Sequence, residues 1–262
     1  MPQILYVVSL SGKDSRLYRH AVVVIRLLLL LFITAHQFPS IVTLYTVDQS
    51  PSLMLQNRVD PQGNIIYTKA RGAWMGNRGL IHNEHQQITR PYRLKAWITC
   101  LLEFKGWHRV VMTPNRYTEL FFLDEATAFA SGHRPCAECR RKNFDLFKAA
   151  WLAGNPEYGF DKKVSINKID EILHSERIDR DGKKIIHEWD VKDLPDGTFV
   201  LHNDAPFLLA NGLFYEWSPF GYKEGIKLPL FKTITVLTPP SIINAFRAGY
   251  RPQIEVSAKA RT

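Results

Sequence analysis

Two of the three cysteines lie close together in the segment SGHRPCAECRR, residues 131–141. Two residues lie between Cys136 and Cys139, a spacing that lets one tight turn direct two thiolates at a single metal ion. The same C-x-x-C pattern serves redox chemistry when the first cysteine opens a helix directly after a strand. Here a predicted helix and then Arg134-Pro135 precede Cys136, so the pattern favours a metal site.

Zinc held as a structural ion needs four protein ligands. Cys100 is the remaining cysteine and is the predicted third ligand. The fourth must be a histidine or a carboxylate, and we predict His82, because the glycine-rich segment around it has the freedom to fold back. His85 is an alternative. His133 lies only three residues before the cysteine pair, so we expect it to pack or to hydrogen-bond near the ligands.

Short elements must position these ligands. Residues 96–112 (AWITCLLEFKGWHRVVM) hold two apolar, β-prone runs around Lys105-Gly106, which predicts a β-hairpin with a two-residue turn. In that register Cys100 faces Val111. Residues 116–123 are the predicted third strand.

Two helices follow. Asp124 is a predicted N-cap and Gly132 a predicted stop, since glycine adopts the left-handed conformation that ends helices. Apolar spacing predicts a second helix over residues 142–153. The first stop, AFASGHRP at 128–135, is echoed by AFRAGYRP at 245–252, which has no cysteine. This half of the motif therefore needs no metal.

The later part of the chain is mixed. It contains a predicted helix over 167–177 and predicted strands over 198–202, 206–209, 213–217 and 233–237, separated by Asp-Gly and Asn-Gly turn signals. Ser241 is the predicted cap of a last helix that ends at Gly249. The fold class we expect is α+β, with a small zinc-stabilised hairpin and helix module followed by a mixed, β-rich C-terminal part. We predict three regions: an atypical extension over 1–53, a basic zinc-binding module over 54–155, and the C-terminal region over 156–262, which can pack as one unit with the module.

The segment YTELFFLDEATAFASGHRPCAECRR, residues 117–141, resembles the second half of the Ada-type zinc-binding module of DNA alkyl-damage repair proteins and some nucleases. The longer run over 71–141 also resembles an uncharacterised bacterial protein family. The Ada resemblance implies zinc on Cys136 and Cys139, with Cys100 as the counterpart of a first-pair cysteine. The Ada-type module has four cysteines, whereas Cys100 stands alone here.

Charge is concentrated around the cysteines. The net charge is +9, and residues 54–155 contribute +7 of it through 15 basic and 8 acidic side chains. A basic region of this kind favours DNA or RNA as a partner. The residues we expect to contact nucleic acid are Arg71, Arg78, Arg134, Arg140, Arg141 and the base-stacking candidate Trp74.

The first 53 residues differ from the rest. Residues 21–35 (AVVVIRLLLLLFITA) are apolar but shorter than the roughly 20 residues that span a bilayer. We expect these residues to be a non-native or dispensable extension. They would be non-native if translation of the natural protein begins at Met54. A membrane anchor and a signal or buried helix are the alternatives.

The function expected from these features is zinc binding in a cytoplasmic, nucleic-acid-associated protein, in the DNA-repair or nuclease-like context that the resemblance implies. One alternative is an enzyme, either a zinc-thiolate alkyl acceptor or a metal-dependent hydrolase. Another is a structural zinc domain that serves protein contacts. The chain has no Walker or GxGxxG motif, so no small-molecule cofactor is predicted.

Overall fold

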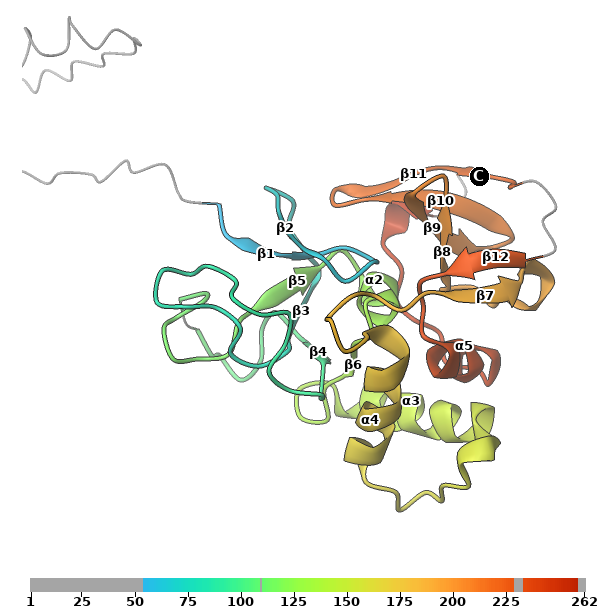
Figure 1. Cartoon of the computed structure of the whole chain (residues 1–262), viewed down its shortest axis with the longest axis horizontal. Coiled ribbons are helices and arrows are strands. Elements are labelled where there is room, and N and C mark those ends of the chain that lie inside the picture. Colours follow the sequence, from blue (N-terminus) through green and yellow to red (C-terminus); the bar gives the residue numbers. More distant parts are fainter. Residues whose placement is uncertain (1–53, 109, 229–232, 259–262) are drawn as a thin grey trace, which may run out of the picture. The chain divides into compact units, whose positions relative to one another are not determined.

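The structure, a computed structural model, describes residues 54–108, 110–228 and 233–258, which belong to one compact unit (Figure 1). The expectations for residues 1–53 lie outside the described residues. The described chain forms two six-stranded sheets and four α-helices, which confirms the predicted α+β class. In the described part, no helix combines the length and apolar character that a bilayer crossing requires.

The first sheet contains the cysteine-bearing elements. Its strands run in the order β2-β1-β5-β3-β4-β6, with parallel pairing only for β1 with β5 and for β4 with β6. The bounds are β1 (Gln56–Val59), β2 (Ile65–Tyr67), β3 (Trp74–Asn77), β4 (Ile98–Cys100), β5 (Leu120–Phe122) and β6 (Arg134–Pro135). Leu120 and Phe122 of β5 pack with Val59, Ile81 and Ala128 under this sheet.

The second sheet is antiparallel throughout, in the order β11-β10-β9-β8-β12-β7. The bounds are β7 (His187–Asp190), β8 (Phe199–His202), β9 (Ala205–Ala210), β10 (Leu213–Ser218), β11 (Gly221–Ile226) and β12 (Thr233–Val236). Asn211 and Gly212, at the predicted Asn-Gly turn, join β9 to β10 with positive φ at both positions, 51° and 71°. Four strands of this sheet match the predicted ones, whereas β7 and β11 were not predicted.

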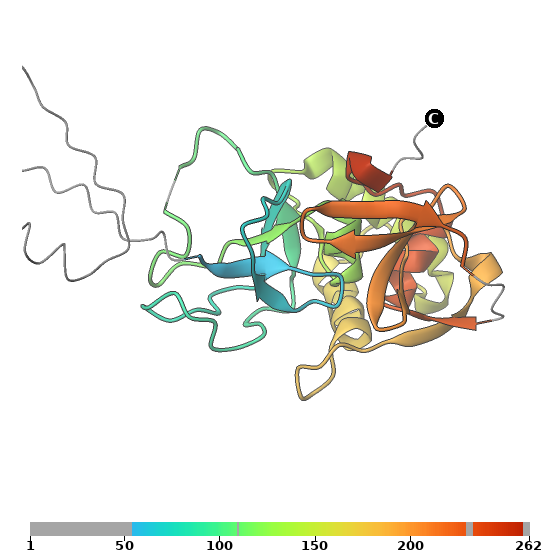
Figure 2. The same ribbon diagram turned by 90° about the horizontal axis from the view of Figure 1, so that it is seen from above.

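Helix α2 (Glu125–Ala130) lies between the sheets and is buried at every position (Figures 1 and 2). Its Ala126 and Ala130 pack under the second sheet, and its Ala128 packs under the first. Phe129 packs against the other helices, which are α3 (Arg141–Gly154), α4 (Ile166–Arg177) and α5 (Pro240–Arg247). The predicted N-cap is confirmed, because the Asp124 carboxylate accepts from the Thr127 N–H at 2.8 Å.

The two echoed segments form the same helix stop. The N–H of Gly132 donates to Phe129, and the N–H of His133 donates to Ala128, at 2.8 and 2.9 Å. The second copy repeats both bonds, from Gly249 and Tyr250 to the carbonyls of Phe246 and Ala245. Both copies are Schellman motifs with a left-handed glycine. The copies also touch, with the rings of Phe129 and Phe246 5.3 Å apart.

The predicted hairpin over 96–112 is wrong. Its turn exists, since Lys105 and Gly106 have positive φ and Trp107 N–H donates to the Phe104 carbonyl at 3.0 Å. The flanking runs do not pair, because β4 pairs with β3 and β6 instead. Cys100 therefore lies opposite Met75 and not Val111.

Two smaller expectations also need correction. The predicted strand over 116–123 is reduced to β5, and the glycine-rich segment after Arg71 contains β3. Ser241 is not the cap of α5. The N-cap is Pro239 with Pro240 at the first helical position, and the Ser241 hydroxyl instead donates to Glu176 at 2.6 Å.

Candidate metal centre

The three cysteines converge on one point. The Sγ atoms of Cys100, Cys136 and Cys139 all lie within 4.8 Å of one another. In a tetrahedral zinc thiolate, sulfurs at about 2.3 Å from the metal are about 3.8 Å apart. The three cysteines could therefore hold a metal ion with only a small contraction.

Parallel pairing of β4 with β6 brings the first and second cysteines together. Thr99 is paired with Pro135, so the next residues, Cys100 at the end of β4 and Cys136 directly after β6, lie side by side. The Cys136 N–H donates to the Thr99 carbonyl at 2.9 Å and extends this ladder to the ligand itself. A backbone bond thus fixes one ligand relative to the other.

The third thiol is positioned by a tight turn. The Arg140 N–H donates to the Cys136 carbonyl at 3.2 Å, and the Glu138 N–H donates to Cys136 Sγ at 3.4 Å. Helix α3 begins directly afterwards, at Arg141. Backbone N–H groups directed at sulfur stabilise thiolates in metal-binding turns of this kind.

Hydrogen bonds link the three cysteine side chains. The Cys100 thiol donates to both partners, which is the largest cause that lowers the pKa of Cys136, to about 5, and that lowers the pKa of Cys139. Burial opposes the effect in both cases, and backbone N–H groups add to it. The same donation raises the pKa of Cys100. The thiolate form of Cys136 is therefore favoured, and a cation bound to the sulfurs would displace the remaining thiol protons.

Arg140 fastens the cysteine turn to the core. It is 3% exposed, donates to Thr99 Oγ1 at 2.8 Å, and forms an ion pair with Glu125 of α2. Its guanidinium lies 3.9 Å from the ring centroid of Trp74. The prediction that Arg140 contacts nucleic acid is not supported, because the buried guanidinium is paired with the Glu125 carboxylate.

The other predicted contact residues divide into two groups. Arg78 and Arg134 are buried, with 2% and 4% exposure, so neither belongs to an exposed surface that a nucleic-acid backbone could cover. Arg71 and Arg141 are exposed, and Arg141 pairs with Asp145. Trp74 donates from Nε1 to Gln253 at 2.7 Å, and Arg140 covers one face of its ring.

His82 lies outside the cysteine group. It is 5% exposed, with Nδ1 2.6 Å from Thr118 Oγ1 and Nε2 3.3 Å from the Thr113 carbonyl. Both ring nitrogens thus face other partners. Among the described residues, no fourth histidine, cysteine or carboxylate joins the three thiols.

His133 is a buried structural residue. Its Nε2 accepts from Arg78 Nε at 3.3 Å, and Nδ1 lies 2.9 Å from Ser131 Oγ, which itself donates to the Ala128 carbonyl. Nδ1 therefore carries the ring proton. Burial, followed by the charges of Arg78 and Arg177, lowers the pKa of His133 well below its usual value. The ring stays neutral and links the helix stop to Arg78.

Sequence reasoning missed two cationic residues near this network, Arg177 and Lys184. A signal for Arg177 was present, because it follows Ile169 and Leu173 at four-residue spacing on the buried face of α4. A charged residue on an apolar stripe calls for a specific partner. For Lys184 we find no comparable signal.

The chain was compared with protein-family models, curated proteins and solved structures, and none of the three comparisons finds a match.

Proposed function

We propose that this is a zinc-binding protein in which the metal stabilises a nucleic-acid-binding surface. The observation that carries the proposal is the convergence of three Sγ atoms from Cys100, Cys136 and Cys139. Soft thiolates favour zinc over the hard cations magnesium and calcium. With no fourth side chain in the group among the described residues, water or another donor completes the tetrahedron.

The metal would anchor a segment that has little other structure. Residues 101–108 and 110–112, the described part of this segment, belong to no strand, and the segment leaves the site directly after Cys100. The Leu101 N–H hydrogen-bonds to the Cys139 sulfur, so the first residue of the segment is tied to the site. Zinc bound to Cys100 would hold the start of this segment against the first sheet.

The same segment forms one wall of a basic groove. Leu102 and Val111 line a groove of about 680 Å³ together with Phe121 of β5. The groove also contains Arg58, Lys69 and Arg71, and no carboxylate lies among its lining residues. Cations beside apolar and aromatic side chains suit a phosphate backbone with unstacked bases. Arg71 is the one predicted nucleic-acid contact that lies here, and it carries the nucleic-acid part of the proposal.

The metal and the nucleic acid are tested separately with the full chain. Elemental analysis of the purified protein is expected to find one zinc per chain, which a chelator removes. Fluorescence anisotropy with single-stranded and duplex oligonucleotides is expected to show binding that weakens with salt. The Lys69→Ala, Arg71→Ala double variant should reduce the log–log salt slope by about 2.

The matched control is Lys162→Ala with Lys163→Ala, which removes two exposed lysines that do not line the groove. This pair is expected to leave the salt slope close to that of the wild type. Absence of binding at low salt by the zinc-loaded protein would exclude the nucleic-acid part. Equal losses for both double variants would exclude the groove as the binding surface.

A further inference from the structure

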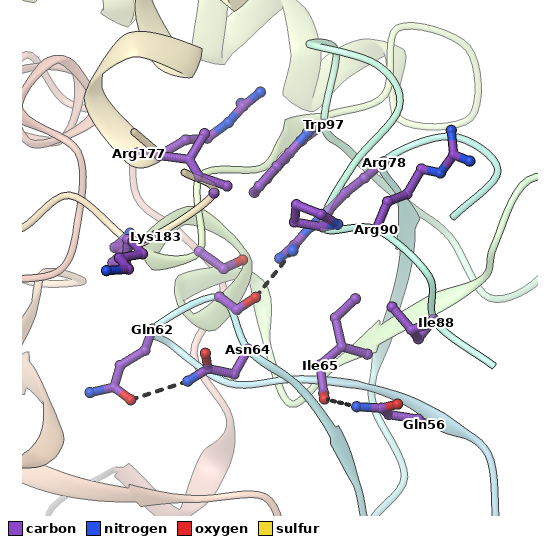
Figure 3. Close-up of a pocket in the computed structure, with 16 residues that line it drawn as sticks. Gln56, Gln62, Asn64, Ile65, Arg78, Ile88, Arg90, Trp97, Arg177 and Lys183 are labelled. Atoms are coloured by element: carbon purple, nitrogen blue, oxygen red, sulfur yellow. Dashed lines mark hydrogen bonds between the residues drawn. The ribbon is translucent and has the colours of Figure 1, made fainter. Parts of the chain in front are cut away.

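A second cavity is separate from the cysteines and the basic groove. It encloses about 420 Å³ between the turn at Gly63-Asn64, the loop at Arg90-Pro91, Trp97, and the turn that follows α4 (Figure 3). Five basic residues line it, and none of its lining residues is acidic: Arg78, Arg90, Arg177, Lys183 and Lys184.

Two of these cations are buried without a counter-ion. Arg78 and Arg177 are 2% and 1% exposed. Within the described residues, neither forms an ion pair with a carboxylate. In the described part of the chain, Nη2 of Arg78 and Nε of Arg177 have no hydrogen-bond partner. Such charges are costly to bury, so their retention indicates that an anion can satisfy them.

Trp97 holds both guanidinium groups in place. The Cζ atoms of Arg78 and Arg177 lie 3.9 and 4.0 Å from the ring centroid of Trp97. Backbone carbonyls add fixed bonds, from Arg78 Nη1 to Gly63 at 3.1 Å and from Arg177 Nη1 to Gly132 at 2.8 Å. Figure 3 shows Arg78 extending towards the turn before Asn64. Carbonyls and an aromatic face orient these groups without neutralising them.

Two acidic groups lie near these cations, and both carboxylates are already engaged. Burial lowers the pKa of Arg177 against the opposing effect of Asp170, but Asp170 forms its ion pair with Arg134. Asp60 lies near Arg78. It accepts from the backbone N–H and the side-chain amide of Asn64, at 2.9 and 3.0 Å. Burial lowers the pKa of Arg78 to about 9, against the opposing effect of Asp60. Burial, with Arg78 and Arg177, lowers the pKa of Lys184 to about 7. Asp60 and Asp170, of which Asp170 is already paired with Arg134, thus do not balance the two buried arginines and the half-buried Lys184.

We propose that this cavity binds the phosphate group of a small phosphorylated molecule. A phosphate monoester carries nearly two negative charges and three acceptor oxygens, which suit several converging cations better than a single carboxylate does. The cavity exceeds the size of a phosphate ion and falls within the range of small-ligand pockets. The proposal involves neither the zinc ligands nor the residues of the basic groove.

Isothermal titration calorimetry of the full chain is the test, with inorganic phosphate, a nucleoside 5′-monophosphate and the matching nucleoside as probes. We expect phosphate and the monophosphate to bind and the nucleoside not to bind. Tighter binding of the monophosphate than of inorganic phosphate identifies a phosphorylated molecule as the occupant. Equal or weaker binding of the monophosphate would overturn that assignment in favour of the free ion.

Variants at the exposed rim keep the fold intact. Arg90→Ala with Lys183→Ala removes two lining charges and is expected to weaken phosphate binding about 10-fold. The matched control, Arg93→Ala with Arg180→Ala, removes two exposed charges from the same loops that do not line the cavity. It should bind like the wild type, as should the groove variant at Lys69 and Arg71.

Arg78→Lys probes the interior, since lysine keeps the charge but not the two-pronged geometry. It should weaken phosphate binding further than the rim variant does, with circular dichroism to verify folding. Absence of binding to the wild type at millimolar phosphate would overturn the proposal. Equal weakening by the rim and control pairs would do so too, because it would indicate general surface attraction.

Discussion

Arg134 and Asp170 form a two-pronged ion pair inside the protein. Nε lies 2.8 Å from Oδ1 and Nη2 lies 2.7 Å from Oδ2, and the two side chains are 5% and 2% exposed. The pair joins β6, two residues before Cys136, to α4. The cysteine turn is therefore held from one side by Asp170 and from the other by Glu125.

Removal of Asp170 should be far more costly than removal of an exposed acid. Asp170→Ala leaves Arg134 buried and unpaired, so we expect a loss of about 3–5 kcal/mol in the free energy of unfolding. Asp145→Ala breaks the exposed pair with Arg141 on α3 and should cost far less, because solvent screens exposed ion pairs. Urea denaturation of both variants measures the difference, and similar losses would contradict the role assigned to Asp170.

The two helix stops should differ in their tolerance of alanine. Gly132 and Gly249 have φ of 88° and 110°, so either substitution strains the backbone by about 1–2 kcal/mol. At Gly132 a Cβ atom would also lie 2.3 Å from Cδ of Arg177, whereas at Gly249 it would meet open space. We expect Gly132→Ala to cost at least about 1 kcal/mol more than Gly249→Ala in urea denaturation. Equal costs would show that Arg177 moves aside freely.

Stability should fall on acidification because of His174. Its Nδ1 lies 3.1 Å from Arg177 Nη2, and burial, then Arg177 and Lys95, lower its pKa to about 4 from 6.5. Between these values the unfolded chain binds a proton that the folded protein does not, so stability is lost as pH falls from about 6.5 to about 4. His174→Asn keeps an acceptor and does not titrate. Its loss of stability over this range should be smaller than that of the wild type, and parallel pH profiles would refute the assignment.

Zinc affinity should depend on the three cysteines and not on their neighbours. Cys100→Ser and Cys139→Ser are each expected to weaken zinc binding at least about 10-fold, measured by competition with a chromogenic chelator. Glu138→Gln changes an exposed residue within the same turn and should bind zinc like the wild type.

His82→Gln separates the predicted fourth ligand from a structural role. Because the ring bonds to Thr118 and Thr113, we expect unchanged zinc affinity and a loss of about 1–3 kcal/mol in stability. Weaker zinc binding by a folded His82→Gln protein would show instead that this histidine moves to the metal.

Local patterns were enough to predict the helix stops and the cysteine turn. Asp124, Gly132 and the C-x-x-C spacing act within a few residues, where capping and turn preferences decide the conformation. The sequence also predicted that Cys100 joins Cys136 and Cys139 at one site, because the chain has only three cysteines. The elements that bring the cysteines together were predicted wrongly. Parallel pairing of β4 with β6, and not the predicted hairpin, positions Cys100.

Burial of the basic residues could not be predicted from the same patterns. Arg134 and Arg140 find Asp170 and Glu125, which lie 36 and 15 residues away along the chain. Nothing local distinguishes such an arginine from one on the surface. The position of His82 away from the cysteines could not be predicted for the same reason, because its partner Thr118 lies 36 residues away.

The bond between Thr99 and Cys136 has a further consequence for folding. A one-residue slip of β6 along β4 would move Cys136 by about 3.3 Å and turn its side chain to the opposite face. Zinc–thiolate bonds tolerate deviations of only about 0.2 Å. Zinc would therefore stabilise correctly paired chains and not slipped ones. The cysteine cluster would then select the correct register of β6, an edge strand of only two residues.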